Sequence, residues 1–514
     1  MNDTPLIGKN YPLDVDEQRR ALASDPLLAR FRASRERLSQ DPYRPFYHFT
    51  SPESMLNDPN GLCFWQGRWH LFYQAYPPED PRQHWGHAVS EDLIHWEDLP
   101  YALKPGPENC CFSGSALVEP DRVIAMYHGT ECGNMVAVSS DPLLLHWEKL
   151  TGDAVIKPYP GAPYVVFDPC IWKRGDYYYS LSAGTLPQPV SGMRTRADFL
   201  FRSLDLVHWE YLHPFYDDNY GEIDDDGACP YFWPLGDRWL LLHFSHVNGG
   251  KWMLGDYDAA RQKFLPCNGG KFNAGSWYPG GVHAPSAAPM PDGSVMAIWN
   301  VNVGKETPGW DQIMSLPRRL TLDGEAHDRL AMEPCAAVET LRGAHTAVGG
   351  TPLPANREVV LPVHGTAMEL RAVFAPGEAS VLELNVFRSA EAREITRIRF
   401  YPRSGRTVWN RLDDLGWFGA HESTLSVETA ESSVGEGSPA RAPETDSFFL
   451  PPDEPLELRV FLDRSVLEVF ANGKIARTLR VYPTLPDADG VSVCARGADG
   501  KLLSLDAWQM EKIF

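Results

Sequence analysis

The sequence predicts an all-β protein: a five-bladed β-propeller followed by a C-terminal β-sandwich, with a short N-terminal helical arm. Three observations predict this fold. From about residue 44 the chain consists of short apolar and aromatic runs separated by Gly, Pro, Asn and Asp, which is typical of short strands joined by turns. One of these runs recurs as an internal repeat. Beyond about residue 346, apolar and polar residues alternate with period two, as in strands with one buried face.

The internal repeat is a short stretch that ends in Trp and Glu. It occurs at Ser90–Glu97, Ser140–Glu148 and Ser203–Glu210, with a weaker form at Asp256–Phe264. The copies lie about 50 to 60 residues apart, which is enough for four short strands each and is typical of propeller blades. Residues 44–345 then have room for roughly five blades, and each Trp is expected to begin an outer strand in a structural role.

Residues 1–43 are predicted to form the helical arm. Apolar residues recur near a 3.6-residue period between residues 14 and 40, among Arg, Glu and Gln. Ser24-Asp25-Pro26 is expected to divide this stretch, because Pro suits the first turn of a helix better than its interior. The arm is expected to lie on the body of the protein, and a homo-oligomer formed through the arm or the sandwich stays open.

Residues 346–514 are predicted to form the β-sandwich. Alternating runs such as Met368–Phe374 and Leu456–Leu462 supply its strands, and Asn472-Gly473 is the central pair of a hairpin turn. Residues 420–446 are rich in Ser, Glu and Pro, which predicts a mobile surface loop.

The composition argues against several classes of protein. Lys and Arg number 47 and Asp and Glu 68, so the 514-residue chain has a net charge of −21. This acidity disfavours nucleic acid and anionic membranes as partners and suits a neutral or cationic ligand. No stretch has the pattern of a signal peptide or a membrane span, and the nine Cys show no metal-ligand spacing. We therefore expect a cytoplasmic protein with reduced thiols, no metal and no other cofactor.

Acidic residues near the predicted blade starts are the candidates for chemistry, because the inner strands of a propeller converge at one end of its channel. Asp58 lies in an Asn-Asp-Pro-Asn-Gly segment ahead of a strand, and Asp168 also precedes a Pro at a blade start. Residues 222–226 hold four carboxylates. An Asp before Pro is also common in turns. Three acidic sites in one propeller suit hydrolysis of a glycosidic bond, which needs a nucleophile or base, a proton donor and a carboxylate that holds sugar hydroxyls.

Several motifs together resemble glycoside hydrolase family 32 of clan J, which contains invertases, levanases and inulinases. His48–Gly61 is similar to the opening motif of that family, whose Asp is the nucleophile, and Leu71–Gln74 to the strand whose Gln contacts the fructosyl unit. Trp85–Trp96, Phe112–Ser115 and Leu458–Phe470 also follow the family pattern. The resemblance runs from about residue 44 to the end. It implies a propeller and a sandwich, and cleavage of terminal fructofuranosyl units from sucrose, fructo-oligosaccharides or fructans.

Two motifs depart from the family pattern. The family has Arg-Asp-Pro where this sequence has Phe167-Asp168-Pro169, and Glu-Cys-Pro where it has Ala228-Cys229-Pro230. The usual proton donor is therefore missing from its place, a loss that normally costs on the order of 10²–10⁴-fold in rate. Asp226, then Asp225, are the candidates to replace it, because the acidic run lies just upstream; Glu222 is a third.

The resemblance implies a retaining mechanism with two carboxylates. Asp58 would attack the anomeric carbon, Asp226 or Asp225 would protonate the leaving oxygen, and Asp168 would hold the hydroxyls of the sugar. The bound sugar would have polar contacts with Asn57, Gln74, Ser113 and Glu222, and the walls of its pocket would be Trp85 and Phe112.

Three other interpretations stay open. A propeller that binds fructosides without cleaving them would fit the missing Glu. A fructosyltransferase would use the same chemistry with a sugar as acceptor in place of water. A related furanosidase, for example one that acts on arabinofuranosides, would fit the missing Arg beside Asp168, because that change should alter which hydroxyls are recognised.

Overall fold

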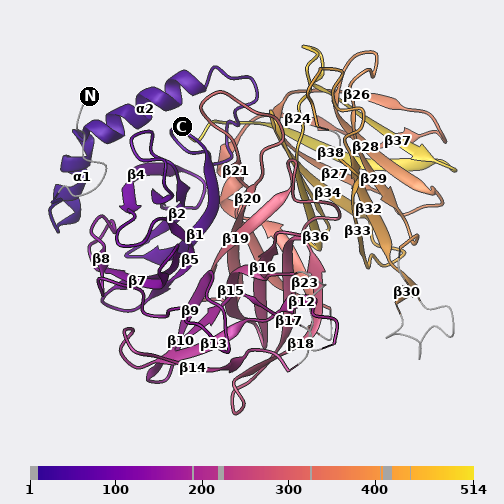
Figure 1. Ribbon diagram of the computed structural model, residues 1–514. Helices are drawn as coiled ribbons and strands as arrows, with labels where there is room; N and C mark the ends of the chain where they lie inside the picture. The colour runs from indigo at the N-terminus through magenta and orange to yellow at the C-terminus, as the bar shows by residue number, and fades with distance from the viewer. Residues whose placement is uncertain are drawn as a thin grey trace.

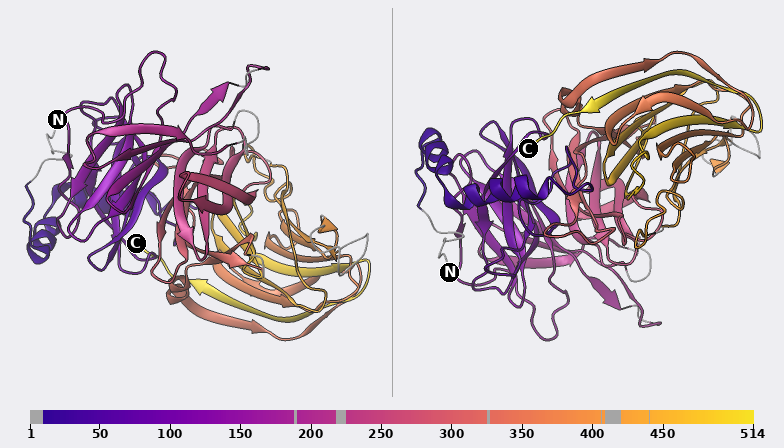
Figure 2. Two further views of the ribbon diagram at one scale, coloured as in Figure 1. Left: turned by 90° about the horizontal axis from the view of Figure 1, so that it is seen from below. Right: turned by 90° about the horizontal axis from the view of Figure 1, so that it is seen from above.

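The computed structural model describes residues 10–187, 190–217, 225–324, 327–405, 407–408, 420–439 and 441–514. In it, a helical arm and a ring of sheets lie beside a two-sheet sandwich (Figures 1 and 2). All nine cysteines are free thiols. Among the described residues, no helix is both long and apolar enough to span a membrane.

The N-terminal arm consists of two helices, α1 (Val15–Ala23) and α2 (Pro26–Leu38). Each begins after an Asp whose carboxylate accepts hydrogen bonds from free backbone N–H groups: Asp14 caps α1, and Asp25 caps α2 through Leu27 N. The break falls at the predicted Ser-Asp-Pro. α2 lies along the outer edge of the first sheet (Figure 1), where Arg35 pairs with Asp98 at 2.6 and 2.7 Å.

Five antiparallel sheets follow one another along the chain. The first two contain β1 (Leu56–Trp65), β2 (Arg68–Ala75), β3 (His84–Ser90) and β4 (Trp96–Leu103), then β5 (Cys111–Val118), β6 (Val123–Gly129), β7 (Gly133–Ser139) and β8 (Glu148–Lys149). The third contains β9 (Pro169–Arg174), β10 (Tyr177–Ser182), β13 (Phe199–Ser203) and β14 (Trp209–Pro214), with the hairpin β11 (Thr185–Pro187) and β12 (Arg194–Arg196) beside it. The fourth and fifth contain β15 (Ala228–Leu235), β16 (Arg238–Ser245), β17 (Gly249–Asp258) and β18 (Lys263–Lys271), then β19 (Val282–Pro289), β20 (Val295–Val301), β21 (Ile313–Met314), β22 (Arg318–Asp323) and β23 (Arg329–Pro334).

The first strands of the five sheets form a closed ring. β1 contacts β5, β5 contacts β9, β9 contacts β15, β15 contacts β19, and β19 returns to β1. This is the arrangement of a β-propeller, in which the innermost strands surround a central channel. The outermost strands begin at the repeated Trp as predicted: β4 starts at Trp96, β14 at Trp209, and β8 directly after Trp147.

The sandwich follows a short 3₁₀ helix, Ala336–Leu341. One sheet contains β24 (Arg342–Val348), β25 (Thr351–Leu353), β38 (Gly500–Met510), β27 (Ala367–Phe374), β34 (Leu456–Asp463), β35 (Val466–Ala471) and β36 (Ile475–Arg480). The other contains β26 (Val359–His364), β37 (Gly490–Arg496), β28 (Val381–Arg388), β29 (Thr396–Tyr401), β32 (Ser423–Glu428) and β33 (Glu444–Phe448), and β30 (Thr407–Val408) pairs with β31 (Ala420–His421).

Two details of the sandwich differ from the sequence prediction. The domain begins at Arg342, four residues before the predicted boundary, because β24 pairs with β38. The predicted loop at 420–446 instead contains β32 and the start of β33. Its composition is polar, but Leu425 and Val427 alternate with polar residues and are buried in the core of the sandwich, which is enough to form a strand.

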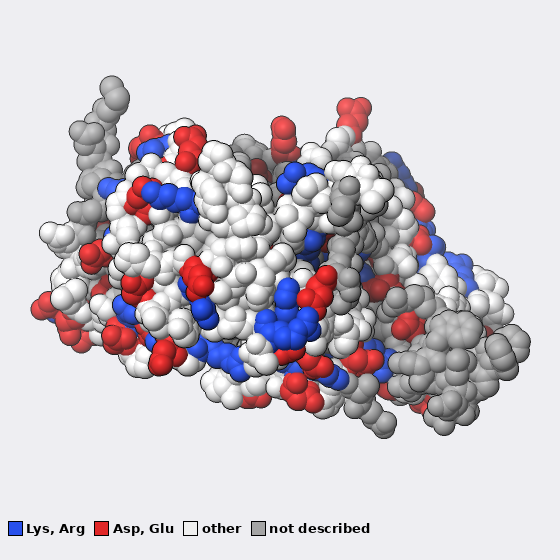
Figure 3. Space-filling model, turned by 60° about the horizontal axis from the view of Figure 1, so that its bottom comes forward, with Lys and Arg blue, Asp and Glu red and all other residues white. Residues whose placement is uncertain are grey.

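The propeller and the sandwich meet at a buried charged cluster. His48 Nδ1 lies 2.8 Å from Asp463 Oδ2, and its Nε2 lies 3.2 Å from Glu468 Oε1. Arg318 of β22 pairs with Glu468 on the other side. On the outer surface, acidic and basic side chains are interspersed over the face seen in Figure 3.

Candidate active site

Each of the five innermost strands places one polar side chain in a single cluster at one end of the channel. Asp58 comes from β1, Ser113 from β5, Cys229 from β15 and His283 from β19, and Asp168 stands directly before β9. Every one of these side chains contacts Asp58 or Asp168. The cluster forms because each residue lies at the start of a strand in a ring of parallel inner strands.

Asp58 is surrounded by donors. Its Oδ2 accepts hydrogen bonds from Ser113 Oγ at 2.6 Å and Gln74 Nε2 at 3.2 Å, and Cys229 Sγ lies 3.5 Å away. His283 Nδ1 lies 3.0 Å from its Oδ1. Burial alone would raise the pKa of Asp58, but His283, Ser113 and Cys229 outweigh burial and lower it below its usual value. Asp58 is therefore ionised and held in one orientation, as a nucleophile requires.

Asp168 has the opposite electrostatic character. Its Oδ2 accepts a hydrogen bond from Cys229 N at 3.1 Å and lies 3.4 Å from Cys229 Sγ. Burial and the neighbouring charge of Asp58 raise the pKa of Asp168 to about 7. Asp58 and Asp168 thus both contact the thiol of Cys229, and their pKa values are shifted in opposite directions. Such a pair is typical of a site that carries out acid–base or nucleophilic chemistry.

The predicted polar contacts lie beside the two carboxylates. Gln74 of β2 donates to Ser113 Oγ at 2.7 Å as well as to Asp58. Asn57 accepts a hydrogen bond from Asn300 of β20 at 3.1 Å, and Asn300 also contacts His283. The structure therefore brings Asn57, Gln74 and Ser113 together around Asp58.

The two predicted aromatic walls differ in position. Trp85 is fully buried, packs against Phe72 and Tyr127, and donates its indole N–H to Phe112 O, so the prediction that it walls the pocket is wrong. Trp85 lies on β3, between its own sheet and the next one, and is therefore a residue of the core. Phe112 is 36% exposed and lies beside His128, which in turn lies beside Phe167. Phe167 stands where the family pattern has Arg.

Asp225 is held in a buried ion pair. Its Oδ2 lies 2.7 Å from Lys251 Nζ and 3.6 Å from His243 Nε2. Burial would raise the pKa of Asp225, but His243, Arg196 and Lys251 lower it far below its usual value. A carboxylate that stays ionised cannot deliver a proton, so the structure argues against Asp225 as the acid.

Asp226 binds a histidine at the end of β16. Its Oδ2 lies 2.5 Å from His246 Nδ1, and its Oδ1 accepts from His246 N at 3.1 Å. The hydrogen bond to Asp226 raises the pKa of His246 more than burial lowers it, and Asp168 and Asp58 raise it further. Phe244 of β16 pairs in register with Ala228, which stands in the place of the missing Glu, and His246 follows two residues later in the chain, just after β16 ends.

Glu222 lies outside the described residues. Among those that are described, no group of three or more His, Cys, Asp or Glu could hold a metal ion. Sequence reasoning missed Cys229, His283, Asn300 and His246 as site residues. The rule that selected Asp58 and Asp168 was an acidic residue at a blade start. Cys229 and His283 also lie at blade starts, and a rule that included every polar residue there would have selected them. Asn300 lies on β20 and His246 directly after β16, and nothing in their local sequence indicates the site.

Known protein families and relatives match most of this chain. Residues 48–334 match the model of the glycosyl hydrolases family 32 N-terminal domain, and residues 337–509 match that of the family 32 C terminal. A levanase of Bacillus subtilis is 28% identical over 92% of this chain and 71% of its own length. A sucrose-6-phosphate hydrolase of Escherichia coli is 26% identical over 89% of this chain and 94% of its own.

Solved structures share the fold. The crystal structure of fructan 1-exohydrolase IIa from Cichorium intybus has a TM-score of 0.78 at 22% identity, covering 92% of this chain and 98% of that one. Sucrose-6-phosphate hydrolase from Lactobacillus gasseri has a TM-score of 0.75 at 21% identity, covering 98% and 100%.

The fold and the carboxylate pair define the class of the protein as a propeller-and-sandwich glycosidase. Because the family model of the N-terminal domain alone covers more than half of the chain, the protein belongs to glycosyl hydrolase family 32.

Proposed function

We propose that this protein hydrolyses terminal fructofuranosyl units from sucrose, fructo-oligosaccharides or fructans with retention of configuration. The observation that carries the proposal is the cluster of Asp58, Asp168 and Ser113 at the starts of the inner strands. Relatives named levanase, fructan 6-exohydrolase and beta-fructofuranosidase support the substrate class. Related enzymes have been crystallised with 1-kestose and with sucrose.

The first step forms a covalent fructosyl-enzyme. The ionised Asp58 carboxylate attacks the anomeric carbon while the bond to the leaving oxygen breaks. His283 beside Oδ1, and Ser113 and Gln74 beside Oδ2, keep the carboxylate fixed. Asp168 accepts hydrogen bonds from ring hydroxyls, and these bonds tighten as positive charge develops on the sugar.

The leaving oxygen must receive a proton from a group other than residue 228, which is Ala. We assign this role to His246. Asp226 accepts its hydrogen bond, which fixes the ring and favours its protonated form. The imidazolium gives its proton to the glycosidic oxygen, and the neutral imidazole then takes a proton from the water that releases Asp58. Asp226 thus contributes by orienting the ring and stabilising its charge, in place of the direct donation expected from the sequence. The charged groups around His246 are Asp226, Asp168 and Asp58, with His283 6.3 Å away between ring centres.

Sugar release from a substrate panel tests the function. Sucrose, short inulin- and levan-type fructans and an aryl arabinofuranoside would be incubated with the wild-type protein and with Asp58→Asn. We expect free fructose from the wild type and a loss of at least about 10³-fold in the variant, because the nucleophile is gone. Saturable sugar binding without any turnover would instead support the binding protein, and release of arabinose the related furanosidase.

The proton donor is tested with two leaving groups. His246→Gln should lower kcat on sucrose by about 10²–10⁴-fold, but much less on 4-nitrophenyl fructofuranoside, whose leaving group needs little protonation. The matched control is His208→Gln, because His208 makes the same Nδ1–Oδ2 contact, at 2.7 Å, with Asp205 on an outer turn. Equal losses on both substrates would show that His246 positions the site without donating the proton.

A further inference from the structure

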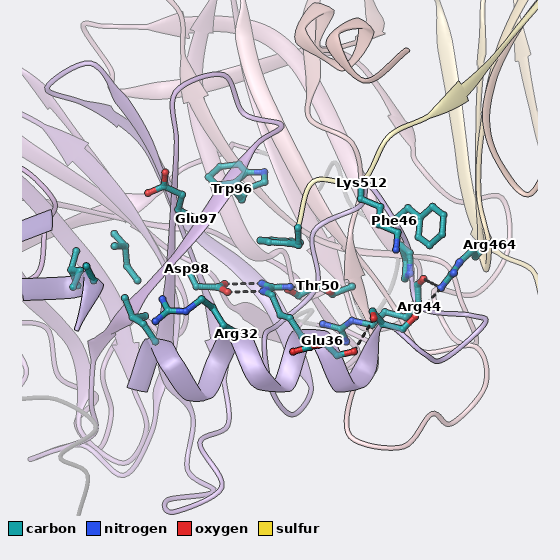
Figure 4. A pocket seen from close by; sticks show the side chains of 18 of the residues that line it. Arg32, Glu36, Arg44, Phe46, Thr50, Trp96, Glu97, Asp98, Arg464 and Lys512 are labelled. Atoms are coloured by element: carbon teal, nitrogen blue, oxygen red, sulfur yellow. Dashed lines mark hydrogen bonds and ion pairs between the residues drawn. The ribbon is translucent and has the colours of Figure 1, made fainter. Parts of the chain in front are cut away.

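A pocket lies beneath the N-terminal arm. It has a volume of about 660 Å³ and lies between α2, the segment after it, the edge strand β4 and the C-terminal end of the chain (Figure 4). This size is within the range of cavities that take small organic molecules. Neither Asp58 nor Asp168 lines it, so the pocket is separate from the catalytic cluster.

The lining of this pocket is basic although the whole chain carries a net charge of −21. Three acidic side chains line it: Glu36, Glu97 and Asp98. Six basic side chains face them, and they come from the arm, the propeller start and the sandwich: Arg19, Arg32, Arg35, Arg44, Arg464 and Lys512.

Two of the three acids are already paired. Asp98 accepts two hydrogen bonds from Arg35, and Glu97 pairs with Arg19 at 3.1 Å. Arg464 donates to backbone carbonyls of the segment after α2, which carry no charge. Within the described part of the chain, Arg32 and Lys512 have no carboxylate partner. The basic side chains that line the pocket therefore outnumber its acidic side chains by six to three.

Arg44 is the clearest sign of a missing partner. Its side chain is 4% exposed, and its Nη2 donates to Ser51 O at 2.7 Å. Its Nη1 is buried and has no hydrogen-bond partner among the described residues. Burial and the neighbouring charge of Arg35 lower the pKa of Arg44 to about 9. A buried guanidinium with a free donor is costly unless an anion completes its hydrogen bonds.

The walls of the pocket are aromatic. Phe46 lies under the guanidinium of Arg464 at 3.8 Å and beside Lys512 at 4.6 Å, and Arg35 stands 3.4 Å over the ring of Phe514. Trp96 completes the lining on β4 (Figure 4). A ligand that fits these aromatic walls has a flat or apolar body. The guanidinium groups require that it also has an acidic group, which can be a phosphate or a carboxylate because guanidinium binds both in the same way.

We propose that the pocket under the arm binds a small organic anion, a phosphate ester or a carboxylate with an apolar body, and that Arg44 is its principal contact. Arg32 and Lys512 add charge at the rim. The ligand would contact the arm, the propeller and the sandwich together, so its binding should stabilise the folded protein.

Isothermal titration calorimetry and thermal unfolding test this site with four probes: phenyl phosphate, benzoate, inorganic phosphate and phenol. We expect phenyl phosphate or benzoate to bind more tightly than inorganic phosphate, and phenol not to bind. Phenyl phosphate and benzoate compared with each other distinguish a phosphate from a carboxylate ligand. Asp58→Asn should bind the same probes unchanged, so failure of the fructosidase proposal leaves this test intact.

Arg44→Met is the decisive variant. It should fold with an unchanged or higher Tm, because it removes an uncompensated buried charge, and should lose at least about tenfold in affinity for the anion. Arg357→Met removes an exposed Arg of the sandwich and should bind as the wild type does. If Arg44→Met does not fold, Lys512→Met takes its place. The proposal is wrong if no probe binds at millimolar concentration, or if these substitutions leave the affinity unchanged.

Discussion

At the scale of the residue, the two carboxyl groups of the site are electrostatically unlike although both are Asp. Asp58 has three donors and a histidine around it, whereas Asp168 faces that charge with one backbone N–H and one thiol. Cys229 connects them and takes a left-handed backbone conformation, with φ of 51°. Such a conformation is costly for a residue with a side chain and is typical of functional sites.

Asp168→Asn should stabilise the protein while it removes activity. Burial and Asp58 raise the pKa of Asp168 from 3.8 to about 7, so its ionisation in the folded state is unfavourable and stability is lost as the pH rises through this interval. We expect the variant to be more stable than the wild type by about 2–4 kcal/mol at pH 8 and nearly equal at pH 4. Urea unfolding at both pH values measures this. A destabilised variant at pH 8 would contradict it.

At the scale of the element, the inner strand β5 is held close to β6 by a glycine. A Cβ on Gly114 would lie 2.1 Å from Met126 O and 2.5 Å from Tyr127 Cα, both backbone atoms that cannot move aside easily. Gly114 also accepts a hydrogen bond from Tyr231 at 2.9 Å through its carbonyl. Ser113, the residue before it, therefore depends on this close approach for its contact with Asp58.

Gly114→Ala should lower both stability and activity. The clash displaces β5 at a cost of about 1–3 kcal/mol and moves Ser113 away from Asp58. The matched control is Gly152→Ala, because Gly152 has open space where its Cβ would lie and no left-handed φ. Thermal unfolding and kcat on sucrose measure the two effects. Wild-type kinetics in Gly114→Ala would show that β5 does not position the nucleophile.

At the scale of the whole molecule, a buried histidine joins the propeller to the sandwich. Burial would lower the pKa of His48, but its hydrogen bonds to Asp463 and Glu468 outweigh burial and raise it to about 9. The charged imidazolium therefore holds two sandwich carboxylates against the start of the propeller. The motif His48–Gly61 therefore begins with a structural residue, His48, and has the proposed nucleophile, Asp58, near its other end.

The stability of the molecule should fall in mild alkali because of this contact. A folded pKa above the unfolded value of 6.5 means that the contribution of His48 is complete below pH 6.5 and is lost as the pH rises through 9. The loss is about 3 kcal/mol. His48→Gln should remove most of this dependence, and His208→Gln, at an exposed position, should keep it. Urea unfolding from pH 6 to 10 measures both, and a flat profile for the wild type would contradict the prediction.

Much of this protein follows from local sequence. The repeated Trp, the break between the helices at Ser24-Asp25-Pro26 and the alternation in the sandwich depend on near neighbours in the chain, so the sequence alone reveals them. Asp58 and Asp168 are also readable, because each lies at a blade start. The sequence prediction missed the strand at Ser423–Glu428 because it relied on the polar composition of residues 420–446 and not on the two alternating apolar residues, Leu425 and Val427.

Only the tertiary structure decides what surrounds those residues. The ion pair of Asp225 with Lys251 and the pairing of Asp226 with His246 form only when β15, β16 and β17 pair into one sheet, and the burial of Trp85 requires the next sheet to pack against it. The same holds for Arg44, whose pocket is built from the arm, the propeller and the sandwich. The sequence by itself determines which groups carry charge and where strands begin, whereas burial and partners, which set pKa values and roles, arise only when the chain has folded.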